Sequence, residues 1–466
     1  MTKRIIIIGA GTGGLALGHA LRKSKADISF HIYERHRTRT DGLFGYRVGI
    51  SPEGSRCLAA CLPERLFAAF VQTTAVAPER FNMVTEQYRE LLSLDLSPST
   101  RRSASSRRER EMDRGIGVER SVSRMTLRQV LLTGLEDVVH FGKHFTHYSD
   151  NHSGTVTAFF ADGTSATGDL LVGAEGTNSP TRKQYLPRAV LRDSGLCGIA
   201  AKVELSEATK QLLPPGASRA VTMINAPGGF GCIIHTMDFP WLRERRPREN
   251  DDGVAVARND EELLRIWPGA TFDNTRNYIL LGFSAPMSSL PADIMSLGGP
   301  ALHKLLLGRT STWHPSFREL VKRSDPSTCF PINVRTTERL RAWPSTNVTL
   351  VGDAIHTMTP GLGVGANTAL LDATILAENL VRVARGQQEV VTAVADYEAE
   401  MHSYAWDRVE KSLKWFDKDA AIYASGVRGS LALMWIRLVL RMTNFLPPLK
   451  RRMAAEMTRE RDGRTT

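Results

Sequence analysis

The segment KRIIIIGAGTGG, residues 3–14, decides the fold of this chain. Its four isoleucines predict a buried strand, and the glycines after them predict a tight turn into a helix. Gly9 permits the turn, Gly11 lets the backbone approach a pyrophosphate, and Gly14 lets the helix pack closely on the strand. The N-terminus of that helix would face the phosphates, because its free N–H groups and dipole attract anions. The segment therefore predicts a dinucleotide-binding βαβ unit.

An acidic residue stands where the second strand of this unit ends. The apolar stretch from Ile28 to Tyr33 is followed by Glu34 and Arg35. The Glu34 carboxylate can accept hydrogen bonds from both ribose hydroxyls of an adenosine, and it would repel a 2′-phosphate. The unit is therefore expected to prefer FAD or NAD over NADP.

A second glycine-rich segment, GDAIHTMTPGLGVGAN, runs from Gly352 to Asn367. It follows a short apolar strand, Val348 to Val351, and precedes a helical pattern, so it has the same order of strand, loop and helix. We interpret both glycine segments as parts of one dinucleotide site.

Between the two segments, from about residue 186 to 344, the pattern changes. Strand-like runs alternate with Pro and Gly loops, which is typical of an antiparallel sheet. The expected strands are Cys197 to Val203, Ala220 to Ile224, Gly231 to His235 and Tyr278 to Phe283, with one helix-like stretch at about 260–266.

These patterns predict one dinucleotide-binding domain in three separated parts, with a substrate domain inserted before the last part. The expected divisions are residues 1–75, 119–185 and 345–385 for the dinucleotide-binding domain, 76–118 for an irregular basic segment, 186–344 for the inserted substrate domain and 386–466 for a helical C-terminal region.

Composition indicates an ordinary globular protein with excess positive charge. The chain has 466 residues, is 42% hydrophobic and carries a formal net charge of +11. Arginines gather in two runs, Arg101 to Glu111 and Arg243 to Arg248, without interleaved aromatic residues. Nucleic-acid binding needs stacking groups or a recognisable module, so solvated basic loops are favoured and no nucleic-acid partner is expected. The positive field can still steer NADPH or an anionic substrate.

The five cysteines are an odd number without a CxxC pair. They predict neither a disulfide framework nor a metal site, and a reducing compartment suits them. A buried strand begins within the first few residues, which leaves no room for a cleavable signal, so we expect a cytoplasmic protein.

Near the C-terminal end, Leu431 to Leu446 is apolar except for a few polar residues and two arginines, Arg437 and Arg441. A membrane-spanning helix needs about twenty apolar residues, and arginines at mid-span are costly. An amphipathic helix is expected instead. It either packs on the body of the protein or lies on a membrane surface beside Lys450–Arg452, which would make the protein peripheral to a membrane.

Five motifs carry a resemblance to a known family: GAGTGG with Tyr33-Glu34-Arg35, GYRVGI from Gly45, RMTL from Arg124, GAEGTNSPTR from Gly173, and GDAIHTMTPGLGVGANTALLDA from Gly352. Together they resemble the single-component FAD-dependent monooxygenases of the aromatic-hydroxylase type, over residues 1 to about 385. The resemblance implies the p-hydroxybenzoate hydroxylase fold. This is an α/β protein with a Rossmann-like FAD-binding domain of the GR2 type, an inserted antiparallel-sheet substrate domain and a helical C-terminus.

By this resemblance, the two glycine segments divide the cofactor between them. Asp353 would accept a hydrogen bond from the ribityl chain, and the backbone from Gly363 to Asn367 would donate to the pyrimidine edge of the flavin. Arg124 is similar to the family arginine that reaches the ribityl and phosphate region. His356 is expected to be scaffold rather than an acid or base. The implied FAD-binding residues are Gly9, Gly11, Gly14, Glu34, Arg35, Arg47, Gly49, Arg124, Asp353, Gly363, Gly365, Ala366 and Asn367.

Two positions leave alternatives open. Arg47 matches the family segment that lies over the flavin ring, but it can equally form a surface ion pair. The family's GADG appears here as Gly173-Ala174-Glu175-Gly176, with Glu in place of Asp. The added methylene moves the carboxylate by about one bond length, so this departure bears on the use of NAD(P)H.

The resemblance further implies that NADPH or NADH reduces FAD, and that O2 then forms a flavin C4a-hydroperoxide. That group delivers oxygen to an electron-rich aromatic or polycyclic molecule, as in secondary-metabolite biosynthesis. Baeyer–Villiger oxygenation, epoxidation, oxidative cyclisation or a non-catalytic binding role stay open. No metal is expected, and no side chain is assigned as catalytic. The candidate substrate lining is Met223, Phe230, Cys232, His235 and Phe283.

Overall fold

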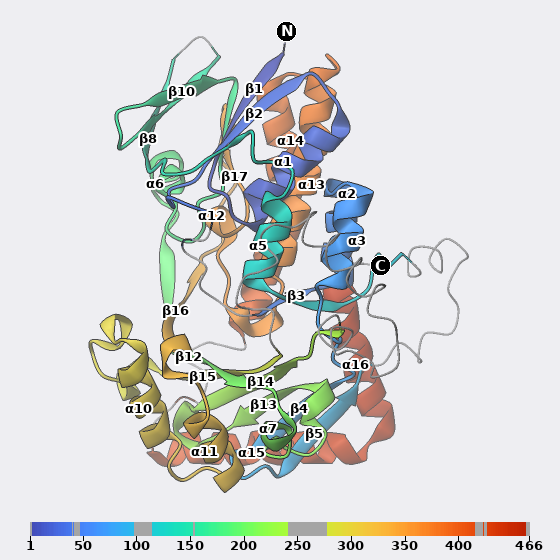
Figure 1. Cartoon of the computed structure of the whole chain (residues 1–466), viewed down its shortest axis with the longest axis vertical. Helices are drawn as coiled ribbons and strands as arrows, with labels where there is room; N and C mark the ends of the chain where they lie inside the picture. Colours follow the sequence, from blue (N-terminus) through green and yellow to red (C-terminus); the bar gives the residue numbers. More distant parts are fainter. Residues whose placement is uncertain are drawn as a thin grey trace, which may run out of the picture.

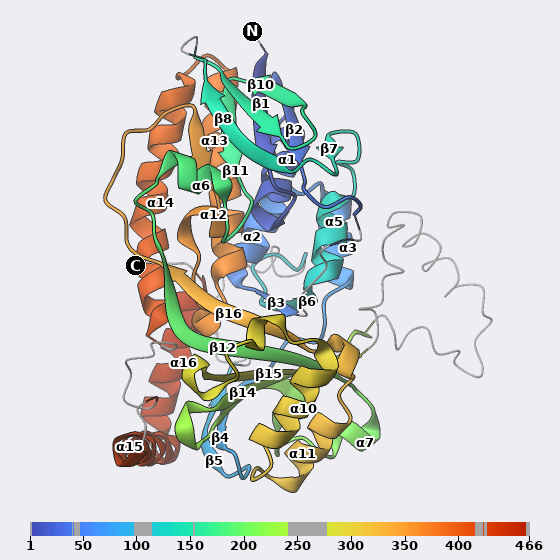
Figure 2. The same ribbon diagram turned by 90° about the vertical axis from the view of Figure 1, so that its left-hand side faces the viewer.

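The computed structural model describes residues 2–39, 41, 47–96, 114–151, 154–240, 277–414, 423 and 426–462. Two large sheets form the centres of two halves that lie one above the other along the long axis of the molecule (Figure 1). Strands β12 (Leu191–Glu204) and β16 (Phe330–Thr337) extend from the lower sheet toward the upper half (Figure 2). The halves are therefore joined by several passes of the chain.

The upper half is built on a five-stranded sheet with the order β17-β11-β1-β2-β7, in which every pair is parallel. The isoleucine-rich strand is its centre, and residues Ile5 to Ile8 are at most 3% exposed. Burial of both strand faces is expected of a parallel sheet that is covered on both sides. The strands are β1 (Lys3–Ile8), β2 (Ile28–Tyr33), β7 (Val139–His140), β11 (Leu170–Gly173) and β17 (Val348–Leu350).

Different layers cover the two faces of this sheet. Ile5 and Ile7 pack into a core shared with helices, whereas Ile6 and Ile8 pack against a small antiparallel sheet. That small sheet contains β8 (Phe145–Asp150), β9 (Val156–Phe160) and β10 (Ser165–Gly168). The helices are α1 (Thr12–Ser24), α2 (Pro52–Cys61), α3 (Glu64–Gln72), α5 (Arg124–Leu132), α13 (Gly365–Ala384) and α14 (Val390–Leu413).

The lower half is built on a seven-stranded sheet with the order β16-β12-β15-β14-β13-β4-β5. The four strands expected in the middle of the chain are confirmed as β12, β13 (Ala220–Asn225), β14 (Gly231–Met237) and β15 (Tyr278–Pro286). Helices α10 (Gly299–Arg309) and α11 (Pro315–Lys322) pack on the face that faces away from the five-stranded sheet (Figures 1 and 2).

The expectation of an irregular segment over residues 76–118 is wrong in its first half. Residues Arg80–Thr85 form β4 and Glu90–Asp95 form β5, and β4 pairs in parallel with β13. A pairing between strands so distant in sequence leaves no local signal, because periodicity reports only which face of a strand is buried. The arginine-rich runs and the helix expected at about 260–266 lie outside the described residues.

The remaining elements include short strands and helices and the two C-terminal helices. They are β3 (Arg47–Ile50), β6 (Arg120–Ser123), α6 (Pro180–Tyr185), α7 (Glu207–Lys210), α12 (Asp353–His356), α15 (Gly426–Phe445) and α16 (Pro447–Asp462). The C-terminal helices α15 and α16 pack beside β5 at the lower sheet. Within the described residues, none of the helices combines the length and the apolar character needed to cross a bilayer.

We predict that Gly14→Ala destabilises the fold, because a Cβ at residue 14 would lie 2.2 Å from the Gly9 carbonyl oxygen. Crowding of this kind typically costs about 1–3 kcal/mol. Urea unfolding of the cofactor-free protein would measure it. The matched control is Gly308→Ala in α10, where the added Cβ meets no atom within 4 Å. Ala has the higher helix propensity, so the control should stabilise by about 0.5–1 kcal/mol. Equal stability of the two variants would contradict the close packing of α1.

Candidate functional site

Three loops from distant parts of the chain meet at the carboxyl edge of the five-stranded sheet. Backbone hydrogen bonds continue the ladder past the strand ends, from Ala174 N–H to the Ile8 carbonyl at 2.7 Å and from Val351 N–H to the Gly173 carbonyl at 2.9 Å. The loops after β1, β11 and β17 are therefore neighbours. Ligands of open α/β sheets bind at this edge.

The first glycine segment has the geometry that its sequence predicts. Gly9 has φ +107°, and a Cβ there would lie 2.5 Å from the Ala174 carbonyl oxygen. Gly11 differs, because its φ is −86° and an added Cβ would meet only one atom, at 3.7 Å. The protein itself therefore requires glycine at 9 but not at 11. A glycine that the fold does not need leaves room for a group that approaches the backbone, and this fits a bound pyrophosphate.

Glu34 is 6% exposed and is held at the start of this loop. Its carboxylate accepts hydrogen bonds from the N–H groups of Ala10 at 2.8 Å and His36 at 3.0 Å. The guanidinium of Arg128 lies 3.6 Å away and donates to the Ala10 carbonyl at 3.2 Å. Arg128 was not predicted, although it follows Arg124 by one helical turn. Arg35, which was predicted as a cofactor residue, is exposed.

Two helix N-termini in the site are uncapped. Helices α1 and α13 lie side by side, and their first turns have no capping side-chain hydrogen bond and no acidic residue in this part of the chain. Free N–H groups and the helix dipole at such an end favour an anion. Gly363 precedes α13 with φ +63° and no atom within 4 Å of an added Cβ, and Gly365 and Ala366 are only half-buried.

Asp353 lies where the chain leaves β17. Its side chain is accessible to solvent, yet the surrounding protein desolvates the carboxyl and raises its pKa. Arg124, exposed at the first residue of α5, is close enough that its charge opposes this increase. The charge of Arg124 therefore acts on the carboxyl of Asp353, as expected for two residues of one site.

Asn367 holds the second loop instead of presenting its amide to a ligand. It is fully buried; its Oδ1 accepts the Ser51 N–H at 2.9 Å, and its Nδ2 donates to the Gly49 carbonyl at 2.9 Å. A Cβ at Gly54 would lie 2.0 Å from Asn367 Oδ1, so glycine is required there. Gly49 therefore contributes its carbonyl to the hydrogen bonds that hold Asn367. Arg47, on the same strand, donates from Nε to the Ser121 hydroxyl at 3.0 Å.

His356 is part of a buried polar cluster, as the sequence predicted for a scaffold role. Its Nε2 lies 2.6 Å from Asp372 Oδ2, and both side chains are fully buried. Asp372 also accepts the Gly352 N–H at 2.7 Å and the Tyr404 hydroxyl at 2.6 Å. Burial lowers the pKa of His356, but the charge and hydrogen bond of Asp372 outweigh it, so the pKa is raised. The cluster fixes Gly352 at φ +62° and thereby positions Asp353.

Glu175, the departure from the family pattern, anchors the start of α6. Its carboxylate accepts hydrogen bonds from the Ser179 hydroxyl at 2.8 Å, the Thr181 N–H at 3.1 Å and the Thr181 hydroxyl. Burial raises its pKa. The next residue after Thr181, Arg182, is 1% exposed and donates to the Ala354 carbonyl at 2.8 Å. Glu175 therefore shapes the loop that Arg182 ties to the Asp353 segment.

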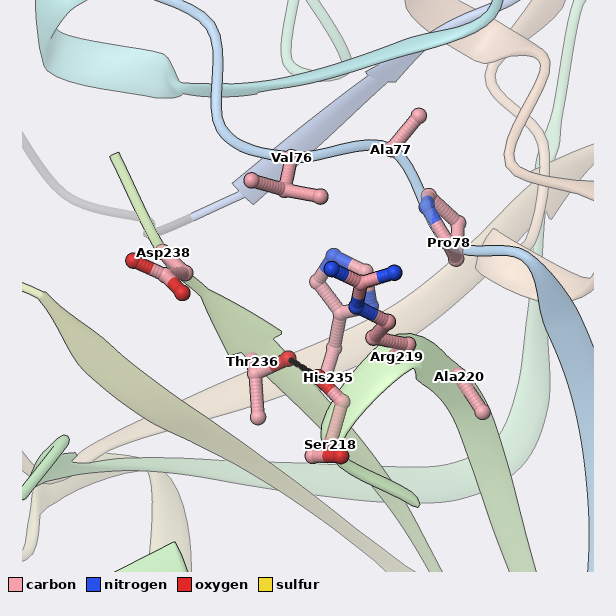
Figure 3. A pocket seen from close by; sticks show the side chains of 9 residues that line it. All are labelled: Val76, Ala77, Pro78, Ser218, Arg219, Ala220, His235, Thr236 and Asp238. Atoms are coloured by element: carbon pink, nitrogen blue, oxygen red, sulfur yellow. Dashed lines mark hydrogen bonds between the residues drawn. The ribbon is translucent and has the colours of Figure 1, made fainter. Parts of the chain in front are cut away.

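The predicted substrate lining belongs mostly to the core. Cys232 and Phe283 are buried under α10 and α11, and Phe230 packs beside them. Met223 packs with the C-terminal helices. His235 is 2% exposed and lines a cavity of about 30 Å³, with Thr236 donating to the Ser218 carbonyl nearby (Figure 3). A cavity of this size holds one or two water molecules. In the described residues, no three His, Cys, Asp or Glu side chains are grouped as metal ligands.

Comparisons with known proteins agree with this geometry. Residues 316–412 match the family model of the FAD binding domain. The chain is 31% identical to the dual O-methyltransferase/FAD-dependent monooxygenase CTB3 of Cercospora beticola, over 88% of this chain and 46% of that protein. It is 26% identical to the FAD-dependent urate hydroxylase of Klebsiella pneumoniae, over 88% of this chain and 89% of the other. The chain therefore spans about half the length of the CTB3-type relatives.

Solved structures give the same picture. A protein from Photorhabdus luminescens described as an FAD-containing monooxygenase superposes with a TM-score of 0.72 at 30% identity, over 91% of this chain and all of the other. HpxO of Klebsiella pneumoniae, complexed with FAD and uric acid, shares the fold with a TM-score of 0.71 at 22% identity, over 98% and 96% of the two chains.

We predict that Gly11→Ala leaves the unfolding free energy of the cofactor-free protein within about 1 kcal/mol and lowers FAD affinity at least about tenfold. The added methyl group would make only one contact in the protein, at 3.7 Å, but it would occupy the position of a bound pyrophosphate. Urea unfolding and fluorescence titration with FAD measure the two effects. Unchanged FAD affinity would remove Gly11 from the cofactor site.

Asp372→Asn should destabilise the protein by about 3–5 kcal/mol, because it leaves His356 without its buried counter-charge. The raised pKa of His356 means that its ion pair stabilises below the ordinary pKa of 6.5 and that this stability is lost as pH rises through the folded value. Unfolding from about pH 6 to about pH 9 should therefore show a decline in wild type that the variant lacks.

The control for this variant is Asp407→Asn, since Asp407 pairs with Arg339 at the surface. Exposed pairs contribute about 0–1 kcal/mol. A pH dependence that is the same in wild type and Asp372→Asn would show that His356 is not charged in the folded protein.

Proposed function

This chain belongs to the single-component FAD-dependent monooxygenases, and we propose that it uses NAD(P)H and O2 to hydroxylate an apolar aromatic or polycyclic small molecule. The observation that carries the proposal is the convergence of two uncapped helix N-termini, those of α1 and α13, with Asp353 at one edge of the parallel sheet. In this arrangement the free N–H groups of α1 could donate to phosphates, and those of α13 could donate to the edge of a flavin ring.

The residues present fit FAD along its length. Glu34 would accept the ribose hydroxyls of the adenosine half, and the start of α1 beyond Gly11 would bind the pyrophosphate. Asp353, whose carboxyl lies within the field of the Arg124 charge, would accept a hydrogen bond from the ribityl chain. The N–H groups from Gly363 to Asn367 would face the pyrimidine edge of the flavin.

Bound FAD supplies the redox chemistry, since it can accept a hydride from NAD(P)H and then activate O2. The overall reaction balances as substrate–H, O2, NAD(P)H and a proton giving substrate–OH, water and NAD(P)+. The chain's own contribution is electrostatic and positional. The start of α13 would stabilise negative charge on the reduced ring, and the cluster of His356 and Asp372 would keep the preceding turn fixed.

One face of the seven-stranded sheet suits a planar substrate. Strand register places Ile233 beside Gly282 and Ala200, and Ser284 beside Gly198 and Ile332, on the face opposite α10 and α11. Small residues keep the middle of this face low, and Ile332 is 40% exposed. We define these six residues as the platform. Its low, mostly apolar surface would hold an aromatic or polycyclic ring against the flavin side of the molecule.

The names of the relatives suggest which enzymatic step follows the hydroxylation. CTB3 and elcB carry both O-methyltransferase and monooxygenase in their names, and hydroxylation of an aromatic ring yields the phenol that O-methylation uses. We propose that this chain works in secondary-metabolite biosynthesis on such a scaffold. We also propose a membrane surface as a partner of the C-terminal helices, so that the protein is peripheral to a membrane.

The proposed reaction predicts a yellow protein with absorbance near about 450 nm, a property of bound flavin. With candidate aromatics under ¹⁸O2, NADPH oxidation should be accompanied by one labelled oxygen atom in the product. Asp353→Asn should lower flavin content without unfolding the chain. A colourless protein that cannot be reconstituted with FAD would refute the proposal.

A second variant distinguishes an effect on substrate binding from an effect on cofactor binding. Gly282→Val raises the middle of the platform next to Ile233, so it should increase the KM for an aromatic substrate while leaving flavin content unchanged. If KM is unaffected for every substrate that wild type oxidises, the platform is not the substrate surface.

A further inference from the structure

Helix α15 turns Arg437 and Asn444 toward the protein, while most of its large apolar side chains face solvent. On the inner side, Arg437 donates to the Glu86 carboxylate and to the Asn225 carbonyl, the latter at 2.6 Å. Asn444 accepts the Ser93 N–H at 3.1 Å and donates to Glu90 at 2.7 Å. A helix at the surface of a globular protein usually has the reverse orientation. The polar contacts fix which side of α15 faces outward.

The outward side is a continuous apolar face. Its residues recur at spacings of three and four, so they share one side of the helix. Val427, Trp435 and Phe445 are 76%, 62% and 81% exposed. The complete face, which we call the outer face of α15, consists of Val427, Leu431, Met434, Trp435, Leu438, Val439, Met442, Phe445 and Leu446, each at least 47% exposed. An apolar patch of this extent marks an interaction surface.

Most of the charge along α15 and the first half of α16 is positive, and the first carboxylate of these helices is Glu456. From Gly426 to Ala455 the chain contains six cationic residues and no carboxylate. Arg437 points inward, while Arg428, Arg441, Arg451 and Arg452 are exposed. The partner of this surface must therefore accept apolar side chains and supply negative charge beside them.

We propose that the outer face of α15 inserts into the surface of a bilayer that contains anionic lipid. This inference rests on the proposed membrane contact and names its chemistry. A helix with aromatic and aliphatic residues on one side and flanking cations binds in the plane of such an interface. Anionic headgroups provide the complementary charge. No spanning segment is required, which agrees with the helices of the described chain.

A second copy of the chain is a poorer occupant. A symmetric dimer places the same patch on both sides of the interface, so the exposed arginines of one copy would meet those of the other. Docking on a bilayer has no such conflict. In both views α15 lies at the end of the molecule distant from the five-stranded sheet (Figures 1 and 2). The carboxyl edge of that sheet, with Asp353, would thus stay away from the lipid.

Vesicle sedimentation of the full chain tests the proposal, with protein scored by staining and bound flavin by absorbance. The vesicles are phosphatidylcholine alone, or phosphatidylcholine mixed with phosphatidylserine. We expect binding to the mixed vesicles that salt weakens. The double variant Trp435→Gln and Phe445→Gln should reduce partitioning at least about tenfold, since both side chains lose their apolar burial. Arg428→Gln and Arg441→Gln should each reduce it about fivefold.

The matched control is Val190→Gln, which changes an apolar residue that is 61% exposed elsewhere on the molecule. It should bind vesicles as wild type does. Equal binding of wild type and the Trp435 and Phe445 double variant would overturn the proposal, as would failure of folded protein to bind mixed vesicles. Equal binding to both vesicle types would overturn the requirement for anionic lipid. A dimer in vesicle-free buffer that the double variant converts to monomer, without vesicle binding, would assign the face to a second copy.

Loss of the proposed monooxygenase activity would look different. A protein that binds vesicles but carries no flavin would contradict the function and leave the docking surface intact. A yellow protein that does not bind vesicles would contradict the docking surface and leave the proposed function intact.

Discussion

The parallel pairing of β1, β11 and β17 is the constraint on which the rest of this structure depends. It brings loops from the two ends of the chain to one edge of a sheet, and it does so through strands that are buried on both faces. Close packing at that edge then follows, because the Ala174 carbonyl leaves no space for a side chain at Gly9. Two helices can start side by side with free N–H groups only because these strand ends coincide.

Polar side chains that are themselves buried hold the loops in place. Asn367 ties the start of α13 to β3, Arg182 ties the loop after β11 to the Ala354 carbonyl, and Asp372 ties Gly352 to His356. The bonds to Gly49, Ala354 and Gly352 satisfy backbone groups, and the bond between Asp372 and His356 pairs two buried polar side chains. The same side chains therefore stabilise the fold and preorganise the site, which leaves the outer backbone N–H groups available for a ligand.

The lower sheet has one face that packs in the core and one face that is left for a ligand. Helix α15 likewise has one side against the protein and one side open to solvent. Cys232 and Phe283 fill the core under α10 and α11, whereas glycine and alanine keep the platform low on the opposite face. In α15 the usual order is inverted, because Arg437 and Asn444 are satisfied by Glu86 and Glu90 on the protein side. The surfaces proposed for a flat substrate and for a lipid interface thus consist of side chains that lie outside these packed cores.

The sequence by itself determined the βαβ unit, the second glycine segment and the antiparallel strands from β12 to β15. All of these depend on local spacing, on glycine geometry or on motifs whose residues are close in the chain. Only the tertiary structure decided that β4 pairs with β13, that Glu175 anchors α6 and that Asn367 turns its amide inward. It also decided which side of α15 is exposed. Periodicity states that a residue is on one face of an element, but the partner of that face is chosen by packing between segments distant in sequence.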